Sequence, residues 1–302
     1  MPGELVARAL REFGVTIDDA ARPSDAQSGA GVYRVRTLGG AAAYLKVTPV
    51  ALGPSALAAA QRELGFYRQL ADDMPVRTPR MLDALDADLG VAMLLAAAGE
   101  QVQVDRWRGA AWSALGQDLA ALHGVQVAPR SWARPDALLT AMSGPVPSSI
   151  TAFWSGILPG LSDLLDARDE LRAELAAQPA VLVHGDCHTG NIVHGPDGLV
   201  FCDWQSVGAG RATCDLAMVS VRAAPAGVAV PSSAMTAYMD RRGGAFSGLE
   251  RALVLEELAI FVFLWPPYAA YNSQTGIAHV QARARDLAAR WRAMMPPPAS
   301  AL

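Results

Sequence analysis

The spacing of three side chains, Asp186, Asn191 and Asp203, most restricts the folds that this chain can adopt. Glycines stand beside the first two, and they predict a loop there because glycine is common where a chain turns sharply. The short apolar runs at residues 181–183 and 199–202, which flank the loop, are typical of strands. We therefore expect these two runs to pair as a small hairpin that carries the loop, with Asp203 at the end of its second strand.

Composition and charge exclude several classes of protein. The 302 residues are 52% hydrophobic and 18% charged, which is enough for one large domain or two smaller ones. A net charge of -4 provides no basic surface for nucleic acid. The N-terminal residues 1–12 lack the order of a secretory signal, and the longest apolar stretch, 258–270, is shorter than the roughly 20 residues of a membrane helix. We expect a cytoplasmic protein with neither nucleic acid nor membrane as a partner.

The same three side chains match the needs of phosphoryl transfer. This reaction requires a carboxylate that orients the acceptor, metal ligands, and cations on the phosphates. Asp186 and Asn191 reproduce the Asp-x-x-x-x-Asn spacing of a kinase catalytic loop, and Asp203 follows the next strand. The pattern predicts a kinase that uses ATP or GTP, with Asp186 as the catalytic base and Asn191 and Asp203 as ligands of Mg²⁺.

A zinc site is the alternative for this stretch of sequence. Cys187, Cys202 and Cys214 lie near three histidines, and His184 and His188 stand four residues apart, as a helical ligand pair would. The glycines argue for a loop instead, and no Cys-x-x-Cys is present. We favour the interpretation that the cysteines are small buried hydrophobic residues.

Hydrophobic periodicity predicts a change of structure near residue 98. Before it we expect a helix over 4–13, strands at 32–36 and 43–47, a helix over 55–70, and strands at 81–84 and 91–95. After it we expect helices over 112–123, 151–178 with a kink at Pro159, 249–264 and 277–294. The predicted domains are a nucleotide-binding lobe at 1–98 and a catalytic and substrate-binding lobe at 99–302.

The run from His184 to Asn191 resembles the aminoglycoside phosphotransferase and choline kinase superfamily. The motifs that carry the resemblance are His184-Gly185-Asp186-Cys187-His188-Thr189-Gly190-Asn191, Asp203-Trp204-Gln205, Asp215-Leu216-Ala217, Leu119-Ala120-Ala121-Leu122-His123 and Arg62-Glu63. They cover roughly residues 28 to 220. The resemblance implies an α+β, two-lobed protein-kinase-like fold, with a small antiparallel-sheet N-lobe and a mainly helical C-lobe.

The resemblance also implies roles around the nucleotide. Lys46 would contact the phosphates, and Glu63 would pair with it. The residues themselves agree, because Lys46 lies in an apolar strand, where burial of its charge requires compensating partners. The run Ser28-Gly29-Ala30-Gly31 fits a phosphate-covering loop, since glycines let backbone amides approach a phosphate. Within it, Ser28, Gly29 and Gly31 would contact the nucleotide. Leu95 and Ala97 would belong to the hinge that meets the nucleobase.

Three further residues of the motifs are expected to support the site. By the resemblance, His184 would bond the backbone near the metal ligands rather than act as the base. His188 would touch the substrate or cap the turn, and Asp215 would help to order the loop after Asp203.

The sequence leaves the acceptor open. Among the acidic residues of the last helices, Glu256 and Glu257 would suit a cationic antibiotic, whereas Trp265 and Tyr268 would suit a quaternary ammonium such as choline. We expect a small hydroxylated antibiotic as substrate, and a monomer or homodimer. Kinases of choline, amino acids or sugars are rivals. A silent kinase-like binding protein or a protein kinase is disfavoured, because the set of motif residues is full and no Ala-Pro-Glu follows Asp203.

Overall fold

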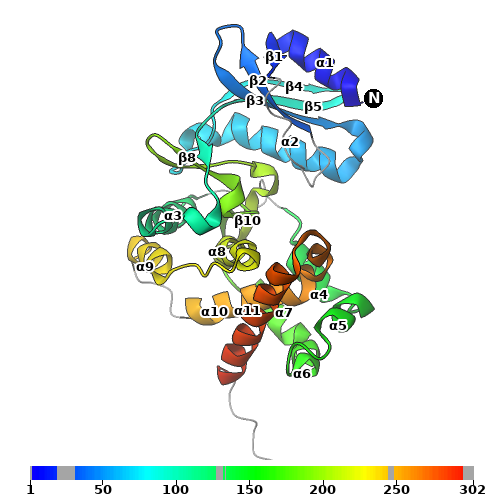
Figure 1. Ribbon diagram of the computed structural model, residues 1–302, viewed down its shortest axis with the longest axis vertical. Helices are drawn as coiled ribbons and strands as arrows, with labels where there is room; N and C mark the ends of the chain where they lie inside the picture. The colour runs from blue at the N-terminus through cyan, green and yellow to red at the C-terminus, as the bar shows by residue number, and fades with distance from the viewer. Residues whose placement is uncertain (1, 19–30, 127–131, 133, 244–247, 295–302) are drawn as a thin grey trace, which may run out of the picture. The chain divides into compact units, whose positions relative to one another are not determined.

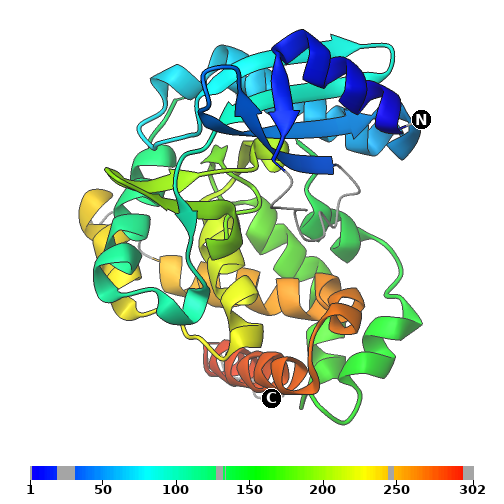
Figure 2. The same cartoon turned by 45° about the horizontal axis from the view of Figure 1, so that its top comes forward.

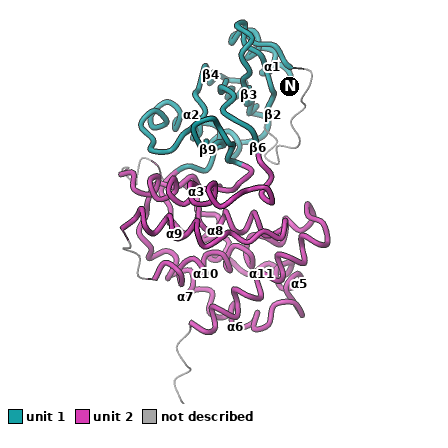
Figure 3. Tube along the Cα trace, turned by 60° about the vertical axis from the view of Figure 1, so that its left-hand side comes forward, with its two compact units in different colours: residues 1–101, 191–207 teal, residues 102–190, 208–302 magenta. Residues whose placement is uncertain are grey.

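The computed structural model of the chain describes residues 2–18, 31–126, 132, 134–243 and 248–294. The chain divides into two compact units (Figure 3). Unit 1 comprises Met1–Gln101 and Asn191–Val207, and unit 2 comprises Val102–Gly190 and Gly208–Leu302. The predicted domains, 1–98 and 99–302, stay a prediction. The division into units assigns a segment from the middle of the chain to unit 1.

Unit 1 contains a five-stranded antiparallel sheet in the order β1-β2-β3-β5-β4 (Figure 1). Its strands are β1 (Val15–Ile17), β2 (Gly31–Thr37), β3 (Ala42–Pro49), β4 (Met81–Ala87) and β5 (Gly90–Ala96). The turn between β2 and β3 contains Gly40 at a φ of 80°, a conformation that favours glycine. The strands predicted at 32–36, 43–47, 81–84 and 91–95 are confirmed.

Helices α1 (Pro2–Phe13) and α2 (Pro54–Gln69) pack against this sheet from opposite sides (Figure 1). Side chains alternate along a strand, so Leu45 and Val47 of β3 join Leu5 of α1 in one apolar core. Lys46, between them, reaches Glu63 of α2 on the other side. The alternation thus fixes the face of the sheet from which this lysine projects.

The remaining strands pair differently from the predicted hairpin of 181–183 with 199–202. In unit 1, β9 (Gly198–Phe201) pairs with β8 (Ile192–Gly195), which pairs with β6 (Glu100–Gln101). In unit 2, β7 (Ala180–Val183) pairs with β10 (Gly208–Arg211). The hairpin of 181–183 with 199–202 is therefore wrong. Gly195-Pro196-Asp197-Gly198 has the composition of a tight turn, and this turn closes β8 on β9 with a shorter loop than the predicted pairing would need.

Unit 2 is otherwise helical. Its described α-helices are α3 (Gly109–Leu122), α4 (Ala137–Ser143), α5 (Ser148–Trp154), α6 (Leu161–Asp166), α7 (Arg168–Ala176), α8 (Ala212–Ala223), α9 (Ser232–Arg241), α10 (Leu249–Ala259) and α11 (Gln274–Ala293). Helices α3 and α9 lie side by side in Figures 1 and 2. Their close approach requires Gly116, because a Cβ there would lie 2.0 Å from the Ala234 carbonyl oxygen.

Two predicted helices differ in detail from the structure. The single kinked helix over 151–178 is wrong, because α5, α6 and α7 are separate. Gly156 and Gly160 lie between α5 and α6 with φ angles of 73° and 70°, which are not helical. The helix over 249–264 is α10, continued by a π-helical turn at Ile260–Leu264. Across the described ranges, no helix is both long and apolar enough to span a bilayer.

Candidate active site

A buried ion pair joins β3 to α2 in unit 1. The Nζ of Lys46 lies 2.6 Å from Oε2 of Glu63, and the two side chains are 9% and 0% exposed. Glu63 stands on the buried face of α2 beside Leu64 and Phe66. A charge removed from water in this way is costly unless it is paired and hydrogen-bonded. The pairing predicted between Lys46 and Glu63 is thus present as a contact.

Asp203 adds a second carboxylate to this pair. Its Oδ1 lies 2.7 Å from Nζ of Lys46, while its side chain remains 41% exposed. Asp203 has a φ of 62°, and among the described residues no other non-glycine residue has a positive φ. Such a left-handed residue costs free energy and is held by its surroundings, frequently at functional sites.

The surroundings that hold Asp203 come from the next residues. The Trp204 amide donates to Oε1 of Glu63 at 3.1 Å, and its indole stacks on Phe66 with ring centroids 4.0 Å apart. Arg62 of α2 donates to the Gln205 carbonyl at 3.2 Å. Helix α2 and the segment after β9 are therefore bound together at a backbone amide, an aromatic stack and a guanidinium.

Lys46, Glu63 and Asp203 form a cluster whose charges do not cancel. Lys46 contributes one positive charge, whereas Glu63 and Asp203 contribute two negative charges. Burial alone would lower the pKa of Lys46, but attraction to Glu63 and Asp203 outweighs it and raises that pKa. Burial raises the pKa of Glu63, with Lys46 opposing the shift. A cation beside the exposed carboxylate of Asp203 would balance the excess negative charge.

In unit 2, Asp215 of α8 holds the loop that follows β7. Its two carboxylate oxygens accept hydrogen bonds of 2.8 Å from the amides of His184 and Gly185. Nε2 of His123 lies 3.2 Å from Oδ2 of Asp215, and both side chains are 0% exposed. Burial alone would raise the pKa of Asp215, but the hydrogen bonds and the field of His123, together with His184 and Gly185, lower it.

The other ring nitrogen of His123 extends this network. Nδ1 of His123 lies 3.0 Å from the hydroxyl of Tyr238 on α9, which is fully buried. The series of side-chain contacts from Tyr238 through His123 to Asp215 thus links α9, α3 and α8 to the backbone of the loop. The sequence marked His123 and Asp215 as motif residues, but it gave no signal for Tyr238, because a lone tyrosine has no characteristic spacing.

Asp186 lies within this held loop. Its amide donates to Nδ1 of His184 at 3.4 Å, and its side chain is 44% exposed. Nδ1 of His188 accepts from the Gly190 amide at 3.0 Å, while its Nε2 lies 3.8 Å from Oδ2 of Asp186. Asn191, the first residue of the second segment of unit 1, accepts from the Cys202 amide at 2.8 Å. Asp186 and Asn191 thus belong to different units.

Comparison with known proteins decides the family. The sequence profile described as "Phosphotransferase enzyme family" matches residues 21–252. The chain belongs to this family. Its motif residues therefore stand in a kinase-type phosphotransferase.

Solved structures share the fold of this chain over 95–96% of its length. An amicoumacin kinase in complex with AMP-PNP, Ca²⁺ and Ami has a TM-score of 0.65 at 16% identity, covering 95% of this chain and 93% of its own. An aminoglycoside phosphotransferase, a thermostable mutant of APH(4)-Ia with ADP and hygromycin B, gives 0.61 at 15%, with coverages of 96% and 99%. A protein assigned as a fructosamine-3-kinase from Haemophilus somnus gives 0.61 at 13%, with coverages of 96% and 97%. No curated protein matches the sequence. The predicted two-lobed, kinase-like α+β fold is confirmed.

The residues predicted to meet the nucleotide are described in part. Ser28 and Gly29 lie outside the described residues. Gly31 begins β2 opposite Val47, and a Cβ there would lie 2.6 Å from the ring of Tyr33. Leu95 is buried in β5, and the Ala97 amide donates to the carbonyl of Ala42 at 3.2 Å. Their contact with a nucleotide stays a prediction.

The residues predicted to meet the acceptor lie in unit 2 of this phosphotransferase. Glu256 accepts two hydrogen bonds from Arg211, at 2.8 and 2.7 Å, and Glu257 accepts two from Arg283, at 2.7 and 2.8 Å. Each carboxylate is at most 2% exposed. Neither offers a free charge to a cationic acceptor in this arrangement, because an arginine already neutralises it.

Trp265 and Tyr268, the predicted aromatic pair, differ in burial. Trp265 is buried in the core of unit 2 with its ring 5.7 Å from that of Phe153. Tyr268 is 44% exposed, and Tyr271 is 74% exposed. The two tyrosines are therefore at the surface, whereas Trp265 is buried and does not join them in an aromatic site for a quaternary ammonium. No group of three or more His, Cys, Asp and Glu side chains within the described ranges could hold a metal ion by itself.

Proposed function

We propose that this phosphotransferase moves the γ-phosphoryl group of ATP or GTP to a hydroxyl of an antibiotic, and so inactivates it. The observation that carries the proposal is the cluster of Lys46, Glu63 and Asp203, which holds a buried ammonium and an exposed carboxylate side by side. In this assignment, Glu63 fixes Lys46, and the ammonium group binds the phosphate oxygens.

The same cluster fits a magnesium ion. Mg²⁺ takes oxygen ligands and is often held by one or two carboxylates together with the phosphates of the substrate. Asp203 supplies an exposed carboxylate in a cluster with excess negative charge, and Asn191 would add an amide oxygen. Bound there, Mg²⁺ would neutralise charge on the phosphates. The left-handed backbone at Asp203 supports the proposal, since such strain is concentrated at ligand sites.

Asp186 is the catalytic base in this proposal. Its carboxylate is 44% exposed and is thus accessible to an acceptor hydroxyl. The carboxylate of Asp215, in contrast, accepts hydrogen bonds from the backbone of the loop. The hydroxyl would give its proton to Asp186 as its oxygen attacks the γ-phosphorus, and the bond between this phosphorus and the β-phosphate oxygen would break to release ADP or GDP. His184 and Asp215 act as positioning residues, because they hold the loop and do not point a free group outward.

The antibiotic acceptor is supported by the neighbouring folds. Solved neighbours include complexes with amicoumacin-type, hygromycin B and spectinomycin ligands and a macrolide 2'-phosphotransferase. The fructosamine-3-kinase neighbour favours a second candidate, a kinase of a sugar-derived amine. At identities of 13–16%, these neighbours share the fold of this chain.

The test is a coupled assay that follows release of ADP or GDP with Mg²⁺. The acceptors are aminoglycosides, spectinomycin, a macrolide, amicoumacin, fructosamine, choline and amino alcohols, with products identified by mass. We expect an antibiotic that gains one phosphoryl group with wild type and not with Asp186→Asn. Product only from fructosamine, choline or an amino alcohol would overturn the antibiotic assignment. No product from any acceptor would overturn the proposed transfer.

A further inference from the structure

One polar group of α2 is buried without a partner. Tyr67 is 6% exposed, and its ring lies edge-on to Phe66 at a centroid distance of 5.5 Å. Its hydroxyl has no hydrogen-bond partner within the described chain. Leaving such a group unsatisfied costs about 1–3 kcal/mol. A phenolic hydroxyl at this position is therefore better explained by a partner that binds there.

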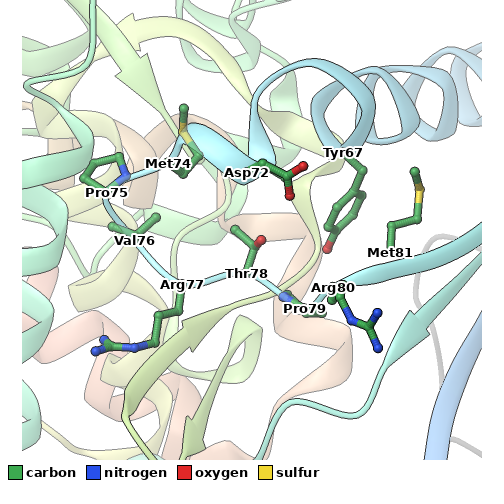
Figure 4. Close-up of a pocket in the computed structure, with 11 residues that line it drawn as sticks. Tyr67, Asp72, Met74, Pro75, Val76, Arg77, Thr78, Pro79, Arg80 and Met81 are labelled. Atoms are coloured by element: carbon green, nitrogen blue, oxygen red, sulfur yellow. The ribbon is translucent and has the colours of Figure 1, made fainter.

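The space for a partner is a cavity of about 650 Å³ in unit 1. It lies between the C-terminal end of α2 and the segment of residues 71–81 that leads into β4. Figure 4 shows the Tyr67 hydroxyl directed toward the part of this segment that carries Thr78 and Arg80. The volume is within the range of small-molecule sites, roughly 300–1,000 Å³.

The polar lining is richer in donors than in acceptors. Burial, together with the negative charges of Glu63 and Asp203, raises the pKa of Tyr67 well above its usual value, so its hydroxyl keeps the proton and donates. Thr78 offers a second hydroxyl, and Arg80 offers an exposed guanidinium. Arg77 also lines the cavity, but its side chain extends away in Figure 4, toward Gly198. The carboxylate among the lining side chains, Asp72, is exposed, so water screens its repulsion.

We propose that this cavity is a second binding site, which takes a small molecule bearing an oxyanion such as a carboxylate or sulfonate. Tyr67 and Thr78 donate hydrogen bonds to the oxyanion, and Arg80 pairs with its charge. The apolar body of the ligand packs on Met74 and Met81, which also line the cavity. Tyr67 lies one helical turn after Glu63 on α2, and the site does not depend on the proposed phosphoryl transfer.

Charge-selective labelling of an introduced cysteine tests the proposal. Thr78→Cys places a thiol in the cavity, and Thr16→Cys places one on an exposed part of β1 as the matched control. Each variant is reacted with the anionic 2-sulfonatoethyl methanethiosulfonate and with its cationic trimethylammonium analogue. The wild-type chain measures the background from its own three cysteines. Ala71→Cys, also in the cavity lining, replaces Thr78→Cys if that variant does not fold.

We expect the anionic-to-cationic rate ratio at position 78, divided by the same ratio at position 16, to exceed roughly fivefold, as for an ion pair near a protein surface. Tyr67→Phe and Arg80→Gln, each added to Thr78→Cys, should lower this quotient, and Asp72→Asn should raise it. Tyr67→Phe should leave the thermal midpoint unchanged or raise it, because it removes an unsatisfied group. A quotient near one, as for a cavity that holds only solvent, or a quotient that Tyr67→Phe does not change, would overturn the proposal.

Discussion

Each unit holds a buried cation between two carboxylates, but the two clusters differ in what they leave exposed. In unit 1, the Asp203 side chain that bonds Lys46 is 41% exposed. In unit 2, the two carboxylates bonded to Arg211, those of Glu256 and Asp136, are 1% and 25% exposed. The guanidinium fork of arginine can satisfy a carboxylate from two positions, whereas the ammonium group of lysine acts as a compact charge. The same kinds of charge thus give a core contact in one unit and a candidate chemical site in the other.

The largest expected effect separates the clusters by stability. Glu256→Gln leaves Arg211 buried with reduced compensation, and it should lower the free energy of unfolding by about 3 kcal/mol. Urea unfolding at neutral pH measures this change. The matched control is Glu250→Gln, which removes an exposed partner of Arg290 and should change the value by less than about 0.5 kcal/mol. Equal effects of the two variants would refute the contrast in burial.

The next effect concerns the activity that depends on the loop of unit 2. Asp186→Asn should lower kcat at least roughly a hundredfold, because a general base typically contributes that much or more. Nucleotide affinity and the urea midpoint should stay near wild type, since the side chain is 44% exposed. Steady-state kinetics and a nucleotide titration measure the two readouts. Near-normal turnover in this variant would show that Asp186 is not the base.

These contrasts also show what the sequence could predict. The Lys46 strand, the Glu63 helix and the Asp186 loop were predictable, because each depends on local periodicity or on fixed spacing. The pairing of β8 with β9 was missed although Gly195-Pro196-Asp197-Gly198 is a strong turn signal.

The partners of acidic residues were harder to predict. Glu256 and Arg211 are 45 positions apart, and Glu257 and Arg283 are 26 apart. No local pattern encodes such a contact, so an internal carboxylate and a substrate-facing one look alike in sequence. The same reason hides Tyr238, which meets His123 across 115 positions.

A pH dependence tests the structural role of Asp215. Its pKa is lowered in the folded chain, so the unfolded chain takes up its proton first as pH falls from about 4. The stability that Asp215 contributes is thus complete above the unfolded pKa and is lost as pH falls through the folded pKa. Urea midpoints measured from pH 6 to pH 3 should fall more steeply for wild type than for Asp215→Asn. Parallel slopes would show that the carboxylate is not held as described.

The smallest effect concerns the end of the same network. Tyr238→Phe removes the hydroxyl that lies 3.0 Å from Nδ1 of His123, and it should cost about 1 kcal/mol of stability. The expected decrease in kcat is smaller than for Asp186→Asn, because Tyr238 acts through His123 and Asp215. Differential scanning calorimetry and kinetics on the same samples give both numbers. An unchanged thermal midpoint would show that this bond does not support the loop.

In the proposed mechanism, the exposed carboxylate of Asp203 holds the metal that accompanies the nucleotide. Asp203→Asn is the sharpest variant, because asparagine also tolerates a left-handed backbone and the change is mainly one of charge. Isothermal titration of ATP and of GTP at increasing Mg²⁺ is the direct measurement. We expect Mg²⁺ to tighten nucleotide binding to wild type, and we expect Asp203→Asn to lose most of this dependence. The same magnesium dependence in both proteins would contradict it.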